Sequence, residues 1–151
     1  AFVQEKDDWI HAHLQQMAEK KRLREQYRKQ ALSKEELQEL ATQAMKLIPQ
    51  KVHYYAQIIG VTYGRITIRN QRTRWGSCSG KGNLNFNCLL LLMPEEVLDY
   101  VVVHELCHRK EMNHSARFWE EVEKILPDYR QRRKWLKDNG GRIMDRNRPV
   151  S

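Results

Sequence analysis

The stretch "VVVHELCHRKEMNHSARFW", residues 101–119, carries three of the chain's six histidines. His104 and His108 are four positions apart, so on an α-helix both imidazoles lie on one face, about one turn apart. Glu105 follows His104 and is rotated from it by about 100° around the helix axis. This spacing predicts a helix that offers two nitrogen ligands to one metal ion and holds a carboxylate beside that ion.

A catalytic zinc ion takes three protein ligands and keeps one position for solvent or substrate. His114 is the predicted third ligand, and the rival candidates are the carboxylates Glu111, Glu120 and Glu121. Because a straight helix would carry His114 away from the other two histidines, the chain has to turn after His108. Asn113 tolerates the left-handed conformation that ends helices, and Ser115 can cap the helix that follows.

Nitrogen ligands in a tetrahedral arrangement favour zinc, and we expect one Zn²⁺ per chain. Glu105 would take a proton from a zinc-bound water and pass it to the leaving group, as in zinc hydrolases with an HExxH motif. Cys107 lies inside the motif, where the intervening side chains pack into the core, so we expect a buried thiol and not a ligand. Tyr100, one turn before His104, is expected in the core or behind that ligand.

The composition is that of a folded protein, with 40% hydrophobic and 30% charged residues. The longest apolar run, residues 89–93, is too short to cross a bilayer. Three cysteines without a CxxC pair argue against a disulfide scaffold and a zinc ribbon, and they favour a cytoplasmic location. The net charge of +8 is concentrated in residues 20–29 and 130–137, which indicates either solvated helix faces or a polyanion partner such as nucleic acid.

Periodicity along the chain predicts several helices and a few short strands. Residues 5–30 form a charged helix that includes Trp9, and "SKEE" at residues 33–36 is a capping box that begins a second helix, which Pro49 should end. Further helices are expected from Pro94 to about Met112, from Ser115 to Pro127, and over a short basic segment that ends near residue 140. We therefore expect a charged helix over 1–32, a main domain over 33–140 and a loose tail over 141–151.

Three short segments between these helices alternate like strands, at residues 65–70, 72–79 and 83–88. The turn at 79–83 joins the last two into an antiparallel hairpin, so the expected sheet is small and antiparallel. Asn83, Asn85 and Asn87 share one face of the last strand. Gly76 marks a bulge or a close approach of the backbone to another group.

The hairpin also supplies candidate substrate-binding residues. Arg72 and Arg74 can hold a carboxylate or phosphate, and Asn85 can donate a hydrogen bond to a developing oxyanion. The alternative is a strand with solvated arginines, Trp75 in the core, and Asn85 engaged in packing between strands.

Several motifs together resemble one known family. They are "TRWGSCS" (73–79), "LNFN" (84–87), "DYVVVHELCH" (99–108), "NHSARFW" (113–119) and "PDY" (127–129). In these residues the chain is similar to the YgjP-like metal-dependent hydrolases, which are relatives of the SprT-like zinc peptidases. The resemblance implies a zincin-like α+β domain with the sheet beside the metal helix. It also implies three ligands, His104, His108 and His114, with Glu105 as the catalytic acid and base.

The resemblance further implies a metallopeptidase, although some members of the family carry a nucleotide-pyrophosphatase label. Members of the family usually have strands before the region that matches "DDWI" (7–10). We therefore expect this chain to be a truncated piece of a longer protein, with a sheet edge left exposed.

Three functions follow as hypotheses. The leading one is a zinc peptidase whose open sheet edge binds an extended peptide. The second is a zinc-dependent nucleotide pyrophosphohydrolase, which the arginines and the positive charge favour. The third is a DNA-associated module with a structural metal. A structural site would need four protein ligands, and the sequence offers three.

Overall fold

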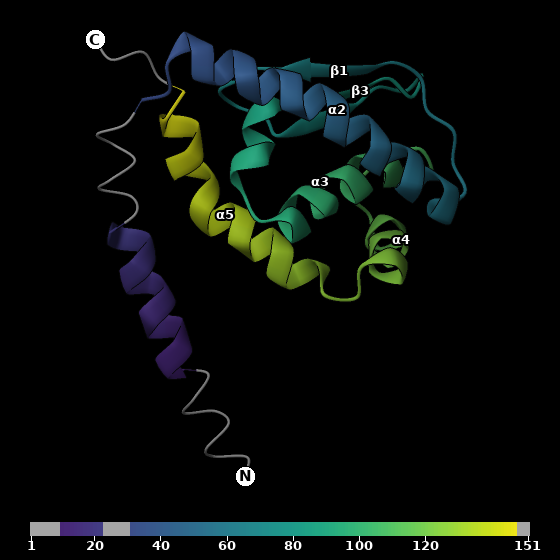
Figure 1. Ribbon diagram of the computed structural model, residues 1–151. Helices are drawn as coiled ribbons and strands as arrows, with labels where there is room; N and C mark the ends of the chain where they lie inside the picture. Colours follow the sequence, from purple (N-terminus) through teal and green to yellow (C-terminus); the bar gives the residue numbers. More distant parts are fainter. Residues whose placement is uncertain (1–9, 23–30, 148–151) are drawn as a thin grey trace.

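The long helix α2 (Lys34–Ile59) runs along one side of the domain in this computed structural model, which describes residues 10–22 and 31–147 (Figure 1). The predicted capping box is confirmed, since Glu36 N–H donates to Ser33 Oγ (3.1 Å) and Ser33 N–H donates to Glu36 Oε1 (3.2 Å). Gly60, in the left-handed region at φ 82°, ends the helix.

The prediction that Pro49 ends this helix is wrong, because Pro49 lies inside α2. A proline there costs about 3 kcal/mol. The same helix buries a stripe of apolar side chains on both sides of the proline, and each buried Val or Ile contributes about 1.5–3 kcal/mol. This stripe consists of Ala44, Ile48, Val52, Ala56 and Ile59. Burial along the stripe therefore outweighs the local cost, a tertiary effect that the isolated segment does not reveal.

Three short strands form one sheet in the order β1-β3-β2: β1 (Ile66–Arg69), β2 (Gly76–Cys78) and β3 (Leu84–Asn87). The hairpin is confirmed, with Gly76 opposite Phe86 and Cys78 opposite Leu84. The expectation of a wholly antiparallel sheet is wrong, because β1 runs parallel to β3. The strand β3 lies between β1 and β2, parallel to the first and antiparallel to the second, so the sheet is mixed.

Asn87 explains how the chain crosses from β1 to β2. Its side-chain amide donates to the backbone carbonyls of Gln71 (2.7 Å) and Arg74 (3.0 Å), which both belong to the connecting segment. Asn87 is consequently only 2% exposed, unlike an asparagine on a solvated strand face. A buried amide that satisfies backbone carbonyls holds this crossing in place.

Helix α3 (Glu95–Cys107) lies at the centre of the fold, against α2, α5 and the sheet (Figure 1). It follows the 3-10 helix η1 (Cys88–Leu92) and is buried on almost every side. The helix was expected to reach Met112 but ends at Cys107. The next residues tighten into turns, with His108 N–H bonded to the Glu105 carbonyl (3.2 Å) and Arg109 N–H bonded to the Leu106 carbonyl (3.0 Å).

A polar contact fixes α3 against α2 on the side away from the histidines. Asp99 forms an ion pair with Lys51 Nζ (2.6 Å) and accepts a hydrogen bond from the Tyr55 hydroxyl (2.9 Å). Burial is the largest influence on the pKa of Lys51 and lowers it, but the bonds to Asp99 and Glu95 outweigh burial and raise that pKa overall. The contact therefore positions the helix that carries His104 and that His108 caps.

Helix α4 (Ala116–Ile125) begins at the predicted cap, where Phe118 N–H donates to Ser115 Oγ (3.4 Å). Helix α5 (Tyr129–Asp145) was expected to end near residue 140, but it includes residues 141–145 of the predicted tail, and Ile143 is buried. Gly140 is therefore inside a helix. A Cβ at this position would lie 3.1 Å from Trp75 Nε1, so the glycine makes room for the indole.

Residues 10–22 are helical and contact α5 through two polar interactions. Lys20 Nζ lies 3.9 Å from Asp138 Oδ2, and Arg142 donates to the Lys20 carbonyl (2.6 Å). Trp9, the rest of the predicted N-terminal helix and residues 148–151 of the tail lie outside the described residues. Within the described part, every helix is too short or too polar to span a bilayer.

Candidate metal centre

The three predicted ligands converge on one point. His104 lies in α3, His108 is the residue that caps it, and His114 comes from the loop before α4. His114 Nε2 lies 3.2 Å from His104 Nε2 and 3.1 Å from His108 Nε2. For Zn–N bonds of about 2.0–2.1 Å, the edges of a tetrahedron are about 3.3–3.4 Å long. Two of the three edges therefore have about the length that a zinc ion requires, and all three nitrogens lie within 4.8 Å of one another.

Hydrogen bonds on the other ring nitrogens set the orientation of two of these ligands. His108 Nδ1–H donates to the Glu111 carbonyl (3.1 Å), and His104 Nδ1 lies 3.3 Å from the Tyr100 hydroxyl. A proton held on Nδ1 leaves the lone pair on Nε2 free for a metal. Tyr100 thus has the position behind His104 that its spacing in the sequence suggested.

The rival carboxylates lie elsewhere. Glu111 contributes its backbone carbonyl, and Glu121 pairs with Lys110 (3.2 Å) and Lys124 (3.1 Å). In the described chain, the ligand atoms that lie together are those of the three histidines. Glu120 is exposed and is not part of that group.

The turn that delivers His114 differs from the predicted one. Among the described residues, only Gly60 and Gly82 have a positive φ, so the left-handed conformation expected of Asn113 is absent there. Successive tight turns at the end of α3 bring the chain round instead. Aromatic side chains of α4 then support the rings, since Phe118 stacks on His108 (4.5 Å between centroids) and Trp119 stacks on His114 (5.9 Å).

Burial favours the neutral form of His104 and His108, which is the form that binds metals. Burial, together with the positive charges of His108, His114 and Arg133, lowers the pKa of His104 to about 3. Burial also lowers the pKa of His108. Cys107 is fully buried with its pKa raised to about 12, which agrees with the expected core position.

Glu105 lies beside the ligands and is only 6% exposed. Burial raises the pKa of this carboxyl to about 7, although the nearby charge of Arg74 opposes the shift. The close approach predicted for Gly76 is confirmed, because a Cβ there would lie 3.1 Å from both Cγ and Oε2 of Glu105. The backbone of β2 therefore covers the carboxylate directly.

Two cavities meet at His104, Glu105, Gly76 and Arg74. The first, about 280 Å³, also contains the other two histidines and is bordered by Ser77, Cys78 and Met112. The second, about 220 Å³, is largely apolar and is lined by Trp75, Tyr100, Val101 and Leu136. Larger cavities of about 470 Å³ lie between residues 10–22 and α5 and share no lining residue with these two.

The predicted substrate residues have different positions. Arg74 lines both cavities, whereas Arg72 is exposed and lines neither. The Asn85 amide donates to Ser77 Oγ (3.1 Å) and accepts from Arg69 Nε (3.0 Å), so it links the strands. Sequence reasoning missed Leu136 and Arg133, because nothing in a basic helix thirty residues downstream indicates that it faces the metal helix.

Comparison with known proteins gives an independent result. The family model described as "YgjP-like, metallopeptidase domain" matches residues 20–139. The comparison with curated proteins finds no match.

Two solved structures of metallopeptidase zymogens are similar. Abylysin of Pyrococcus abyssi is 25% identical with a TM-score of 0.55, and the match covers 61% of this chain and 94% of that one. Jannalysin of Methanocaldococcus jannaschii is 21% identical with a TM-score of 0.54, covering 60% and 94%. The shared α+β fold and the family match over most of the sequence agree. The chain therefore belongs to the YgjP-like family of metallopeptidase domains.

Proposed function

We propose that this protein is a zinc-dependent peptidase in which Glu105 acts first as a general base and then as a general acid. The observation that carries the proposal is the convergence of three histidine Nε2 atoms beside one buried carboxyl. Neutral imidazoles at this spacing suit zinc. When bound, zinc would lower the pKa of a coordinated water and polarise the scissile carbonyl.

Glu105 would move the proton. With a pKa raised to about 7, this carboxyl can take a proton near neutral pH and release it again. Its oxygens would accept a proton from the attacking water and then donate it to the departing amine. Gly76 allows this carboxyl to sit against the backbone, where little water reaches it.

The edge of β2 supplies a place for an extended substrate. On the described chain, β2 pairs with β3 on one side, and its residues 76–78 border the cavity that contains the histidines. A peptide can add to such an edge through main-chain hydrogen bonds. The apolar cavity of Trp75, Tyr100 and Leu136 would take one side chain, and Arg74 would donate to a substrate carbonyl or carboxylate.

A nucleotide pyrophosphohydrolase is the second candidate, and the Arg74 guanidinium beside Glu105 favours it. A DNA-associated module with a structural metal has less support, because the ligand cluster in the described residues has three members. Cytoplasmic location remains part of the proposal and follows from the scarcity of cysteine.

The test compares the zinc-loaded wild type and Glu105→Gln on casein and on nucleoside triphosphates. We expect the wild type to cleave casein, and we expect the variant to bind one zinc per chain while losing about 10²–10⁴-fold in turnover. Hydrolysis of triphosphates alone would favour the second candidate. A fully active variant would remove Glu105 from the chemistry.

A further inference from the structure

One face of α5 carries an unneutralised row of cations. Arg130, Arg133, Lys134 and Lys137 are spaced i, i+3, i+4 and i+7, so they project from the same side of the helix, and all four are exposed. None of them forms an ion pair with another described residue. Arg132 on the opposite face differs, since it donates to Asp128 (3.0 Å) and to the Glu96 carbonyl (3.0 Å).

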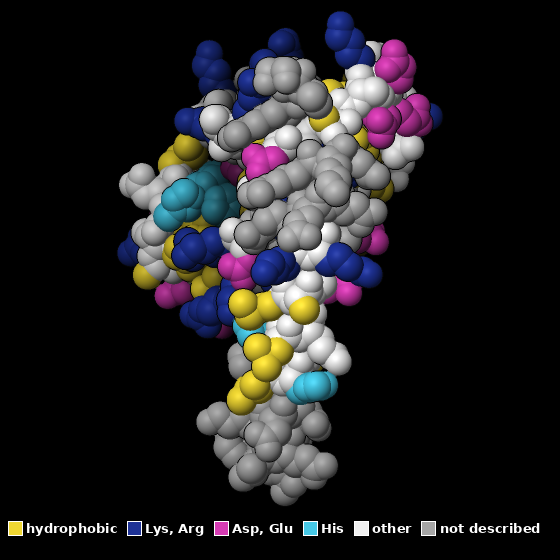
Figure 2. Space-filling model, turned by 90° about the vertical axis from the view of Figure 1, so that its left-hand side faces the viewer, with side chains coloured by type: hydrophobic (Ala, Val, Ile, Leu, Met, Phe, Trp, Pro, Cys, Tyr) yellow, Lys and Arg dark blue, Asp and Glu magenta, His cyan; other side chains and the backbone are white. Residues whose placement is uncertain are grey.

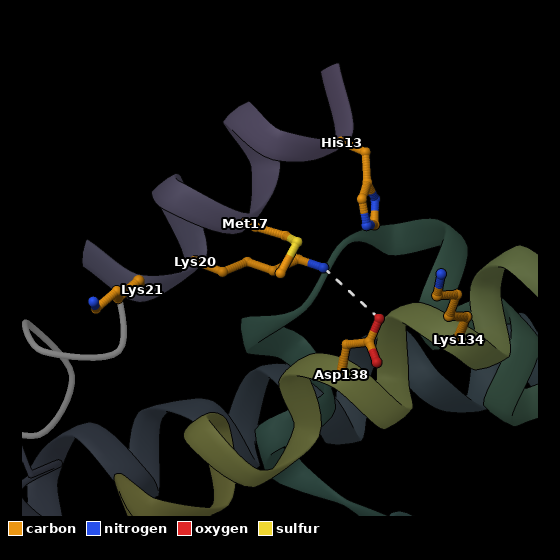
Figure 3. Close-up of a pocket in the computed structure, with 6 residues that line it drawn as sticks. All are labelled: His13, Met17, Lys20, Lys21, Lys134 and Asp138. Carbon is orange, nitrogen blue, oxygen red and sulfur yellow. Dashed lines mark ion pairs between the residues drawn. The ribbon is translucent and has the colours of Figure 1, made fainter. Parts of the chain in front are cut away.

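These cations line a continuous groove, here called the basic groove. Its first part, about 450 Å³, is bordered by Tyr129, the four cations and Asp138. The second part, about 470 Å³, shares Lys134 and Asp138 and adds Lys20 and Lys21 (Figure 3). The only carboxylate lining these two parts, that of Asp138, faces Lys20 at 3.9 Å. Six cations around one carboxylate attract an anionic ligand.

The basic groove begins beside the metal centre. The Arg133 guanidinium lies 4.6 Å from the centre of the Trp119 ring, and the same ring also contacts His114 (5.9 Å) and His104 (5.7 Å). Figure 2 shows lysine and arginine side chains directly next to the histidine group on this face. A ligand in the basic groove would therefore extend to the cavities around Glu105.

Contacts of the aromatic rings decide which anion fits. Tyr129 stacks on Trp119 (5.3 Å), has Arg130 5.2 Å from its centroid, and is only 5% exposed. These rings thus present little open face for stacking a nucleic-acid base. Successive turns of α5 are about 5.4 Å apart, and same-side residues of an extended peptide are about 6.7 Å apart. Carboxylates on alternate residues of a peptide can therefore follow the row of cations.

We propose that the basic groove binds the acidic segment of an extended polypeptide substrate whose scissile bond lies at the metal centre. The cleavage part of this inference rests on the proposed peptidase function, whereas the binding part does not. The proposed substrates are therefore polypeptides with a run of acidic residues to one side of the cleaved bond.

Binding is tested by fluorescence anisotropy with zinc-loaded Glu105→Gln, so that no probe is consumed. The probes are a fluorescein-labelled peptide of alternating Glu and Ser, its Gln-for-Glu counterpart, and a single-stranded oligonucleotide of equal net charge. We expect the acidic peptide to bind at least tenfold more tightly than either of the others. Raising the salt from 50 to 300 mM should weaken that binding severalfold.

The variant Lys134→Gln/Lys137→Gln should weaken acidic-peptide binding about three- to tenfold. Lys34→Gln/Lys46→Gln on exposed positions of α2 removes the same charge away from the groove and should change binding less than twofold. Equal effects of the two double variants, or equal binding of acidic and neutral peptides, would overturn the proposal. Tighter binding of the oligonucleotide would overturn it in favour of nucleic acid.

Cleavage assays distinguish a failure of the groove proposal from a failure of the proposed peptidase function. If zinc-loaded wild type cleaves acidic and neutral peptides with the same kcat/KM, the groove proposal fails and the peptidase stands. If acidic peptides bind through the groove but no peptide is cleaved, the peptidase fails and the binding site stands.

Discussion

Gly76 and Glu105 are in direct contact, so a methyl group on residue 76 would press against the carboxyl. A Cβ on residue 76 would lie 3.1 Å from Oε2 of the carboxyl and 3.2 Å from the Asn85 carbonyl on β3. The backbone on both sides is held by strand pairing, so the carboxyl would have to move. The proposed catalytic group is therefore positioned by the sheet as much as by its own helix.

Gly76→Ala should reduce kcat roughly three- to tenfold while the zinc content stays at one per chain, because the carboxyl would have to shift by a few tenths of an ångström and a shift of about 1 Å in a catalytic group costs about 100-fold. Steady-state kinetics and metal analysis on the same sample would measure both. Gly80→Ala is the matched control, since a Cβ there meets no atom within 4 Å. Equal activity of the two variants would show that this contact does not position Glu105.

Tyr100→Phe should weaken zinc binding about 10-fold without unfolding the protein. The change removes the hydroxyl that lies 3.3 Å from His104 Nδ1, and outer hydrogen bonds of this kind contribute about 10–100-fold to metal affinity. Competition with a chromogenic chelator gives the affinity. Tyr54→Phe, an exposed position on α2, should leave it unchanged. An unaltered affinity in Tyr100→Phe would mean that the hydroxyl does not orient His104.

Arg74→Gln should lower kcat/KM about tenfold, because the guanidinium lines both cavities at the metal centre. Arg72→Gln, two residues earlier and outside both cavities, is expected to stay within twofold of the wild type. Kinetics of the two variants on one peptide decide between the arginines. The reverse order of effects would contradict the placement of Arg74.

In the metal-free protein, Glu105 should contribute a loss of stability as the pH rises from about 4.5 to about 7. Over this interval the folded chain holds a proton on Glu105, whose pKa is raised to about 7, while the unfolded chain releases it. Glu105→Gln does not titrate, so the stability of the metal-free variant relative to the wild type should rise by about 3 kcal/mol between pH 4 and pH 8.

His104 changes the pH dependence of the folding stability in the opposite direction. Its folded pKa is about 3, so the unfolded chain binds more protons below about pH 6.5, and stability is lost as the pH falls toward 3. His104 makes this contribution in both the wild type and Glu105→Gln. The difference between their free energies of unfolding therefore reports on Glu105. Urea unfolding of the two metal-free proteins at several pH values provides the measurement. Stability curves that run parallel from pH 4 to pH 8 would contradict a raised pKa for Glu105.

The clustering of the three histidines could be predicted from the sequence because it depends on local spacing. Four-residue spacing places His104 and His108 on one face, and Ser115 begins the next helix close enough to return His114. The glycine at position 76 also indicated a close approach before its partner was known. In each of these cases, the spacing and residue types within a short segment determine the local structure.

The parts that were wrong depend on contacts distant in sequence. Pro49 stays inside α2 because a long apolar stripe is buried against α3 and the sheet. The segment that connects β1 to β2 is held by the Asn87 amide, which is more than ten residues away along the chain. Gly140 lies inside α5, where Trp75 occupies the space that a side chain would need. Such pairings become visible only when the chain is folded.

The most direct measurement of the central claim is an anomalous-diffraction map of zinc-soaked crystals at the zinc edge. The account predicts one peak about 2.0–2.1 Å from Nε2 of His104, His108 and His114, with the Glu105 carboxyl nearby but outside bonding distance. A peak that is absent from this position, or one bound by a fourth protein side chain such as Cys78, would contradict it.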